Sequence, residues 1–141
     1  MKRISLFLAV LIVINALFVS VAGAEYITRA EAARLLYGLL HMEYDYIPER
    51  LDIQKKSEFS DVAAGDKDYD IINEMSAAGL FKSTGCFEEF KKDMYVTEGF
   101  AKTMLKNAFD YHGGKSNPFS YSAASGHITK QQFSEMLDIL Y

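Results

Sequence analysis

The chain has 141 residues, of which 50% are hydrophobic and 24% charged, and its formal net charge at pH 7 is −4. An acidic chain without clustered basic residues has little to offer the phosphates of a nucleic acid, so we expect no nucleic-acid partner. Cys86 is the only cysteine, which excludes an internal disulfide.

The first segment, residues 1–24, has the pattern of a secretory signal peptide. Two basic residues precede an apolar run over residues 4–21, and a small-x-small cleavage site follows at residues 22–24. The run is also long enough to remain as an uncleaved membrane anchor, which is the alternative interpretation. We expect a secreted protein with one folded domain over residues 25–141 and no membrane association after cleavage.

Three stretches of this domain share one pattern, in which a β-branched residue and a threonine precede a helical stripe. The threonines are Thr28, Thr97 and Thr129, and the residues seven, eight, eleven and twelve positions later are all apolar. That spacing is one face of an α-helix. The stripe residues are Leu35, Leu36, Leu39, Leu40, Met104, Leu105, Ala108, Phe109, Met136, Leu137, Leu140 and Tyr141. Repeated stripes must be buried against one another, so we expect them to share one core.

The residues around the threonines predict how the helices begin. Thr28 can act as an N-cap while Glu31 reaches back to its backbone N–H, which makes a capping box, and Thr129 with Gln132 repeats it. Thr97 is followed by Phe100 where the acid would stand, so half of that box remains. A good helix start is a sufficient explanation of these residue types, and they need no ligand to account for them.

The elements expected in chain order are helices joined by long connectors. One helix runs from Thr28 to about Met42, and a second shows an apolar face over residues 71–78 and ends at Gly79 as its C-terminal cap. Two more begin at Thr97 and Thr129. Residues 44–48, 80–90 and 112–127 read as connectors or loops, and strand signals are weak. The predicted class is all-α.

Residues 59–109 are similar to one complete S-layer homology motif. The similarity is carried by Asp61-Val62, Tyr69 to Asn73, Gly79-Leu80, Phe90 and Val96-Thr97. The family pattern runs from Phe-x-Asp-Val through Trp-Ala-x-x-Ala-Ile and Gly-Ile to Phe-x-Pro and Ile-Thr-Arg-Ala-Glu-Phe-Ala. Residues 27–40 and 128–140 resemble the closing halves of two further copies. The resemblance implies a partial repeat over 25–58, a near-complete repeat over 59–111 and a partial repeat over 112–141.

The sequence departs from the family pattern in its second copy. Lys67 stands at the tryptophan position, Lys92 at the proline after Phe90, and Glu98-Gly99-Phe100 replaces Arg-Ala-Glu. The opening half of the first copy is missing, and that of the third is at best the short Phe119-Ser120 region.

The resemblance implies a fold and a function. In the family, three copies form a pseudo-threefold helical assembly that binds anionic cell-wall polysaccharide in grooves between copies, through basic residues of the motif. Carried over by position, the carbohydrate-binding residues are Thr28, Arg29, Glu31 and Lys130, whereas Glu98 has the wrong sign. An arginine suits a carboxylate ligand because its planar fork bonds both oxygens. We expect Arg29 to face a groove, so that its loss would leave stability nearly unchanged.

The first hypothesis is therefore a secreted, non-enzymatic module, without a cofactor, that attaches non-covalently to polysaccharide of the cell wall at the cell surface. A second is a degenerate scaffold that mediates protein–protein contact or assembly at the envelope, with an envelope protein as partner. A third, a small secreted enzyme, would need a pocket that unites Cys86 or a histidine with an acid.

Other chemistry finds little support in the residues. Asp66 to Asp70 alternate like a calcium loop, but Ile71 and Ala77 replace the required glycine and glutamate, so acids at a helix start explain them better. The three histidines lack metal-ligand spacing, and we expect no metal site. Some tyrosines could stack on sugars or could simply pack at the rim of the core. These are Tyr37, Tyr44, Tyr46 and Tyr69.

Overall fold

The computed structural model describes residues 24–43, 59–111, 117–120 and 124–140, and the regular secondary structure within these ranges is helical. Only isolated bridges, and no extended strands, occur there, so the all-α class is confirmed for the described part. The signal segment and the tyrosine-rich connector lie outside it. The elements are α2 (Arg29–Glu43), α3 (Tyr69–Ala77), α4 (Glu98–Tyr111), α5 (Lys130–Leu137) and a closing 3-10 turn, η2 (Asp138–Leu140).

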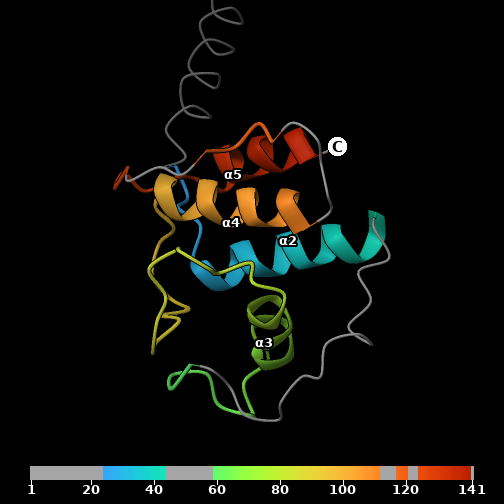
Figure 1. The fold of residues 1–141 in the computed structure, drawn as a ribbon. Helices are drawn as coiled ribbons and strands as arrows, with labels where there is room; N and C mark the ends of the chain where they lie inside the picture. Colours follow the sequence, from blue (N-terminus) through green and yellow to red (C-terminus); the bar gives the residue numbers. More distant parts are fainter. Residues whose placement is uncertain (1–23, 44–58, 112–116, 121–123, 141) are drawn as a thin grey trace, which may run out of the picture.

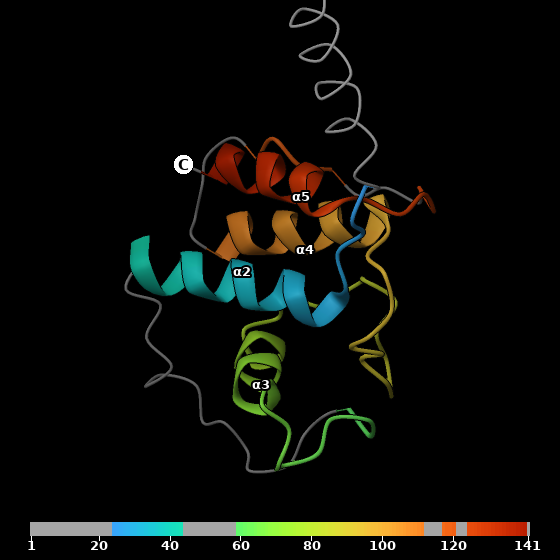
Figure 2. The ribbon, with the colours of Figure 1, turned by 180° about the vertical axis from the view of Figure 1, so that it is seen from behind.

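Helices α2, α4 and α5 run in the same direction, and their N-terminal ends gather at one end of the molecule (Figures 1 and 2). α3 contacts α2 on the side away from α5, and Figure 1 shows it nearly end-on. Helices that run in parallel need long connections between them, which the connectors of this chain supply. The residues at the N-terminal ends of α2, α4 and α5 are thereby brought together.

A closed ring of backbone hydrogen bonds joins the three helix starts. The N–H of Val96 donates to Ile27 O at 2.8 Å, that of Ile128 to Val96 O at 3.1 Å, and that of Ile27 to Ile128 O at 3.2 Å. All three residues are buried. Buried backbone groups must be paired, and here each of the three segments satisfies its neighbour.

The same cyclic order caps the helices. The first N–H groups of a helix have no partner inside it. In this fold the first N–H of each helix donates to a backbone carbonyl of the segment that leads into the next helix. The order is α2 to α4, α4 to α5, and α5 back to α2. The bonds are Arg29 N to Met94 O at 2.9 Å, Glu98 N to Gly126 O at 2.8 Å and Lys130 N to Glu25 O at 2.9 Å.

The predicted side-chain caps form. Glu31 accepts the Thr28 N–H at 2.9 Å, while the Glu31 N–H donates to the Thr28 hydroxyl at 3.3 Å. The Thr129 box is also complete. Thr97 has only the half bond, from the Phe100 N–H at 3.1 Å.

Gly79 ends α3 as predicted. Its φ of +79° is a conformation that glycine adopts without strain. The N–H groups of Gly79 and Leu80 return to Ser76 O and Met75 O, at 2.8 Å and 3.0 Å. These two bonds are a Schellman motif.

The apolar stripes enter one hydrophobic core. Residues of all three stripes belong to it, namely Leu36, Leu40, Met104, Leu105, Ala108, Leu137 and Leu140. The prediction that Leu35 enters the core is wrong, because 48% of Leu35 is exposed, although the equivalent Met104 is fully buried. Leu35 sits at the edge of its stripe, and an edge position is buried only where a neighbouring element covers it. Tyr141 lies outside the described residues.

We predict that Leu36→Ala and Leu105→Ala each lower the free energy of unfolding by about 2–5 kcal/mol, because both side chains are fully buried. Leu35→Ala is the matched control on the same helix and should cost about 1 kcal/mol or less. Urea denaturation measures all three. Equal losses at Leu35 and Leu36 would contradict the assignment of the buried face.

Candidate functional site

The three helix starts meet at three junctions that are built from equivalent positions. At each junction the residue after one threonine and the residue three positions after the next threonine either contact each other or line the same groove. The pairs are Arg29 with Phe100 at the α2–α4 junction, Glu98 with Gln132 at the α4–α5 junction, and Lys130 with Glu31 at the α5–α2 junction. Their chemistry differs, and it decides which junction is open.

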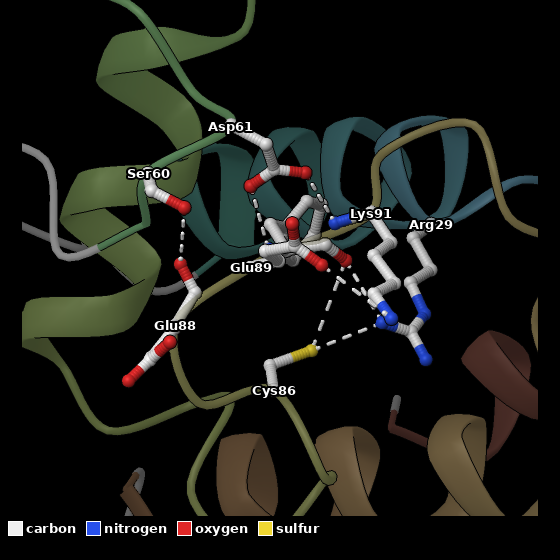
Figure 3. A network of polar contacts seen from close by, with 8 residues as sticks. Arg29, Ser60, Asp61, Cys86, Glu88, Glu89 and Lys91 are labelled. Carbon is white, nitrogen blue, oxygen red and sulfur yellow. Dashed lines mark hydrogen bonds and ion pairs between the residues drawn. The ribbon is translucent and has the colours of Figure 1, made fainter.

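The α2–α4 junction is filled by Arg29. Its guanidinium carbon lies 4.7 Å from the centre of the Phe100 ring, which is a cation–π contact. Its Nη1 donates to Phe90 O at 2.8 Å and to the Cys86 sulfur at 3.3 Å (Figure 3). The buried Nε of the same side chain has no hydrogen-bond partner among the residues that the structure describes. This placement differs from the expectation that Arg29 faces a groove, because the segment from Cys86 to Phe90 and the Phe100 ring enclose it.

Asp61 holds that segment in place. Its two carboxylate oxygens accept the backbone N–H groups of Phe90 and Lys91, at 2.8 Å and 2.7 Å (Figure 3). Ser60 supports the same turn, since its backbone N–H and its hydroxyl both donate to Glu88 O. Asp61 therefore positions the carbonyl of Phe90, which accepts a hydrogen bond from Arg29.

Cys86 is the partner of Arg29 that sequence reasoning did not anticipate. Burial raises the pKa of its thiol, and the nearby Arg29 charge acts against that shift. The thiol is therefore neutral near pH 7 and behaves as a small packing group and a weak acceptor.

The α5–α2 junction is closed by ion pairs. Lys130 Nζ lies 2.9 Å from Glu31 Oε1 and 2.5 Å from Glu25 Oε1. These two hydrogen bonds raise the pKa of Lys130. The Thr28 backbone N–H, with further help from Lys130, lowers the pKa of Glu31 to about 2. Each of the four predicted carbohydrate-binding residues thus has partners inside the protein: Thr28, Arg29, Glu31 and Lys130.

The α4–α5 junction is open. Glu98 pairs within its own helix with Lys102 at 2.5 Å, while Gln132 accepts the Thr129 N–H at 2.9 Å. Between them lies a groove of about 510 Å³. Phe119, Ile128, Met136 and Ile139 make it apolar, Pro118 adds to its wall, and its polar lining is Glu98, Lys102, Gln132 and Glu135.

The negative charge of Glu98 excluded it from the predicted carbohydrate-binding residues, yet Glu98 lines this groove. A signal was available in the pairs themselves. An arginine can lie on a phenylalanine ring and a lysine can pair with a glutamate, but a glutamate and a glutamine offer neither contact. The junction without such a pair is the one that stays open.

A second hollow, of about 430 Å³, is lined by Asp61, Lys91, Lys92, Asp93 and Met94. Its charges are largely paired: Lys92 with Asp66, and Lys91 with Glu89 at 3.5 Å. Asp61 is engaged by the two backbone N–H groups already described. We therefore regard the α4–α5 groove as the better candidate site.

The acids before α3 serve the fold. Asp68, whose side chain is only 3% exposed, pairs with Arg34 Nε at 3.0 Å, and Asp66 accepts the Asp68 N–H at 3.0 Å. Within the described ranges, no three His, Cys, Asp or Glu residues are placed to hold a metal ion. No helix in the described part of the chain is long and apolar enough to cross a membrane.

Two of the four tyrosines considered for sugar stacking are described, and both belong to the rim of the core. The Tyr37 hydroxyl donates to Glu74 Oε2 at 2.5 Å, and burial raises its pKa above the ordinary range. Tyr69 is half-buried at the start of α3. Tyr44 and Tyr46 lie outside the described residues.

Comparison with known proteins finds no matching family model, no matching curated protein and no matching solved structure. We therefore infer function from the geometry of the three junctions.

We predict that Arg29→Ala lowers the free energy of unfolding by about 2 kcal/mol, because it removes a charge-assisted hydrogen bond and a cation–π contact. Arg29→Lys should recover part of this loss, since an ammonium cannot keep the planar contacts of the guanidinium. Lys106→Ala, which breaks an i,i+4 pair with Asp110 on α4, is the control and should cost about 0.5 kcal/mol. Thermal melting at pH 7 measures them. An unchanged melting temperature for Arg29→Ala would show that its side chain is not held.

Glu31 predicts a pH dependence. Its folded pKa of about 2 lies below the ordinary 4.5, so the carboxylate stabilises the fold above about pH 4.5. That contribution is lost as the pH falls towards about 2. Glu31→Gln keeps the shape of the cap but has no charge to titrate, as Gln132 does in the other box. The difference in melting temperature between the two proteins should therefore shrink between about pH 6 and about pH 2. A constant difference across this range would contradict the assignment.

Proposed function

We propose that this chain is a secreted, non-enzymatic module of the cell surface that attaches non-covalently to cell-wall polysaccharide. We also propose that its helices adopt the pseudo-threefold arrangement of S-layer homology domains, in the cyclic order α2, α4, α5. The signal-peptide pattern supports secretion. The ring between Ile27, Val96 and Ile128, and the equivalent backbone bonds that cap the three helices, support the arrangement.

The α4–α5 groove is the observation that carries the proposal. Its volume of about 510 Å³ is in the range of small-ligand sites. Phe119, Met136 and Ile139 offer an apolar wall to the C–H face of a sugar ring. Glu98, Gln132 and Glu135 offer oxygen acceptors for its hydroxyl groups. A site with one apolar wall and several acceptors suits a saccharide better than a purely apolar ligand.

The charges of the groove also bear on the kind of contact. The resemblance implies an anionic polymer, bound through Arg29 and Lys130, but both cations are engaged inside the protein. The groove presents the carboxylates of Glu98 and Glu135 and the ammonium of Lys102, which is paired with Glu98. We therefore propose that the groove bonds hydroxyl or amino groups of the polymer rather than its acidic substituents.

A second candidate function is protein–protein contact or assembly at the cell envelope. One observation favours it: Phe87, in the turn that holds Arg29, is 84% exposed. A large apolar side chain at the tip of a turn can anchor a partner surface. Loss of envelope association in Phe87→Ser, together with full binding to isolated wall polymer, would favour this alternative.

The test is a pull-down of the secreted form on purified cell-wall sacculi, before and after the wall polymer is stripped. We expect binding that depends on the polymer. Glu135→Ala should weaken it about tenfold, which corresponds to about 1.4 kcal/mol. Ser134→Ala is the matched control, because Ser134 is an exposed neighbour on α5 that does not line the groove. Equal binding to stripped sacculi, or full binding by Glu135→Ala, would overturn the proposal.

A further inference from the structure

A cluster of three aromatic rings, which we call the aromatic triad, lies at the joined helix starts. Tyr26, Tyr95 and His127 each stand two residues before a threonine of the repeated pattern. Their ring centres are 5.5, 5.8 and 5.7 Å apart, and the planes are inclined by 50–65° to one another. Each ring packs against the other two. Each of the three segments that lead into α2, α4 and α5 contributes one ring.

The triad is both exposed and firmly held. Tyr26 is 44% exposed, Tyr95 is 48% exposed, and His127 is exposed as well. Their backbones form the isolated bridges with Thr129, Thr28 and Thr97, next to the buried hydrogen-bonded ring. Rigid aromatic side chains lose little conformational freedom when they bind a ligand. Three such rings beside the buried hydrogen-bonded ring of backbone make a preformed surface.

The triad lies beside the start of α4, which contributes Glu98 to the α4–α5 groove. Thr97 forms its bridge with His127, and the next residue, Glu98, lines the groove. The Glu98 N–H also donates to the carbonyl of Gly126, the neighbour of His127, at 2.8 Å. A chain-like ligand that leaves the groove at the start of α4 therefore meets the His127 side of the triad.

We propose that the aromatic triad is a stacking subsite for a sugar ring of the polysaccharide that occupies the groove. This inference rests on the proposed function and adds a second contact surface to it. Tyrosine and histidine each combine a flat apolar face with a polar edge. A pyranose has the matching features, with C–H groups on its face and hydroxyls at its rim. A purely apolar ligand would cover the ring faces but would offer no hydrogen-bonding groups to the hydroxyl and imidazole edges.

The test uses the absence of tryptophan from the chain. Tyr95→Trp places a single fluorescent reporter in the triad, and Phe87→Trp places the control reporter on an exposed turn outside it. Polymer released from sacculi is the probe. We expect a saturable change in the emission of Tyr95→Trp and none in that of Phe87→Trp. In the sacculus pull-down, Tyr95→Ala should bind about tenfold more weakly, while Tyr95→Phe should keep most of the binding.

The outcomes separate this inference from the proposed function. Failure of the wild-type chain to bind sacculi overturns both. If the wild type binds and Glu135→Ala weakens binding, the function stands. In that case, unchanged emission of Tyr95→Trp together with full binding by Tyr95→Ala overturns the stacking subsite alone. Should Tyr95→Ala melt below the assay temperature, the Tyr95→Trp emission decides the question.

Discussion

The structure depends on three backbone hydrogen bonds that join Ile27, Val96 and Ile128 into a closed ring. None of the three segments could bury these residues alone, because each would leave an N–H and a carbonyl without partners. Closing the ring satisfies all of them at once and fixes the register in which the helices start. The first N–H of each helix is then capped by the segment that leads into the next one. The last helix start is thereby hydrogen-bonded back to the first, so the arrangement is closed although the chain itself is linear.

The ring imposes equivalent geometry on three junctions, but the sequence gives each a different pair of side chains. Arg29 lies on Phe100 and Lys130 pairs with Glu31, so the cations of two junctions are engaged in contacts within the protein. Glu98 turns to its own helix and leaves the third junction open. Glu98 stands where the other two junctions have Arg29 and Lys130, so the open junction carries a carboxylate instead of a cation. In our proposal, the groove and the aromatic triad bind successive parts of one ligand.

Local features of the fold could be predicted from the sequence. The box of Thr28 and Glu31, and the end of α3 at Gly79, depend on residues a few positions apart, which a sequence displays directly. The destination of Arg29 could not be predicted, because its partners Cys86 and Phe90 are about sixty positions away and depend on how a connector folds back. Periodicity identifies the face that a helix buries, but not which residue it meets across a junction. The contact between the three rings of the aromatic triad could not be predicted for the same reason, because the rings come from three distant segments.

Amide hydrogen exchange tests the central constraint most directly. If the ring holds the fold together, the N–H groups of Ile27, Val96 and Ile128 can open only when the whole domain unfolds. All three should then exchange with the same free energy, equal to that of global unfolding in denaturant. Exchange of any one of them through a local opening, at a clearly lower free energy than the core amide of Leu105, would contradict the account. The ring would then be a consequence of helix packing rather than the constraint on which the packing depends.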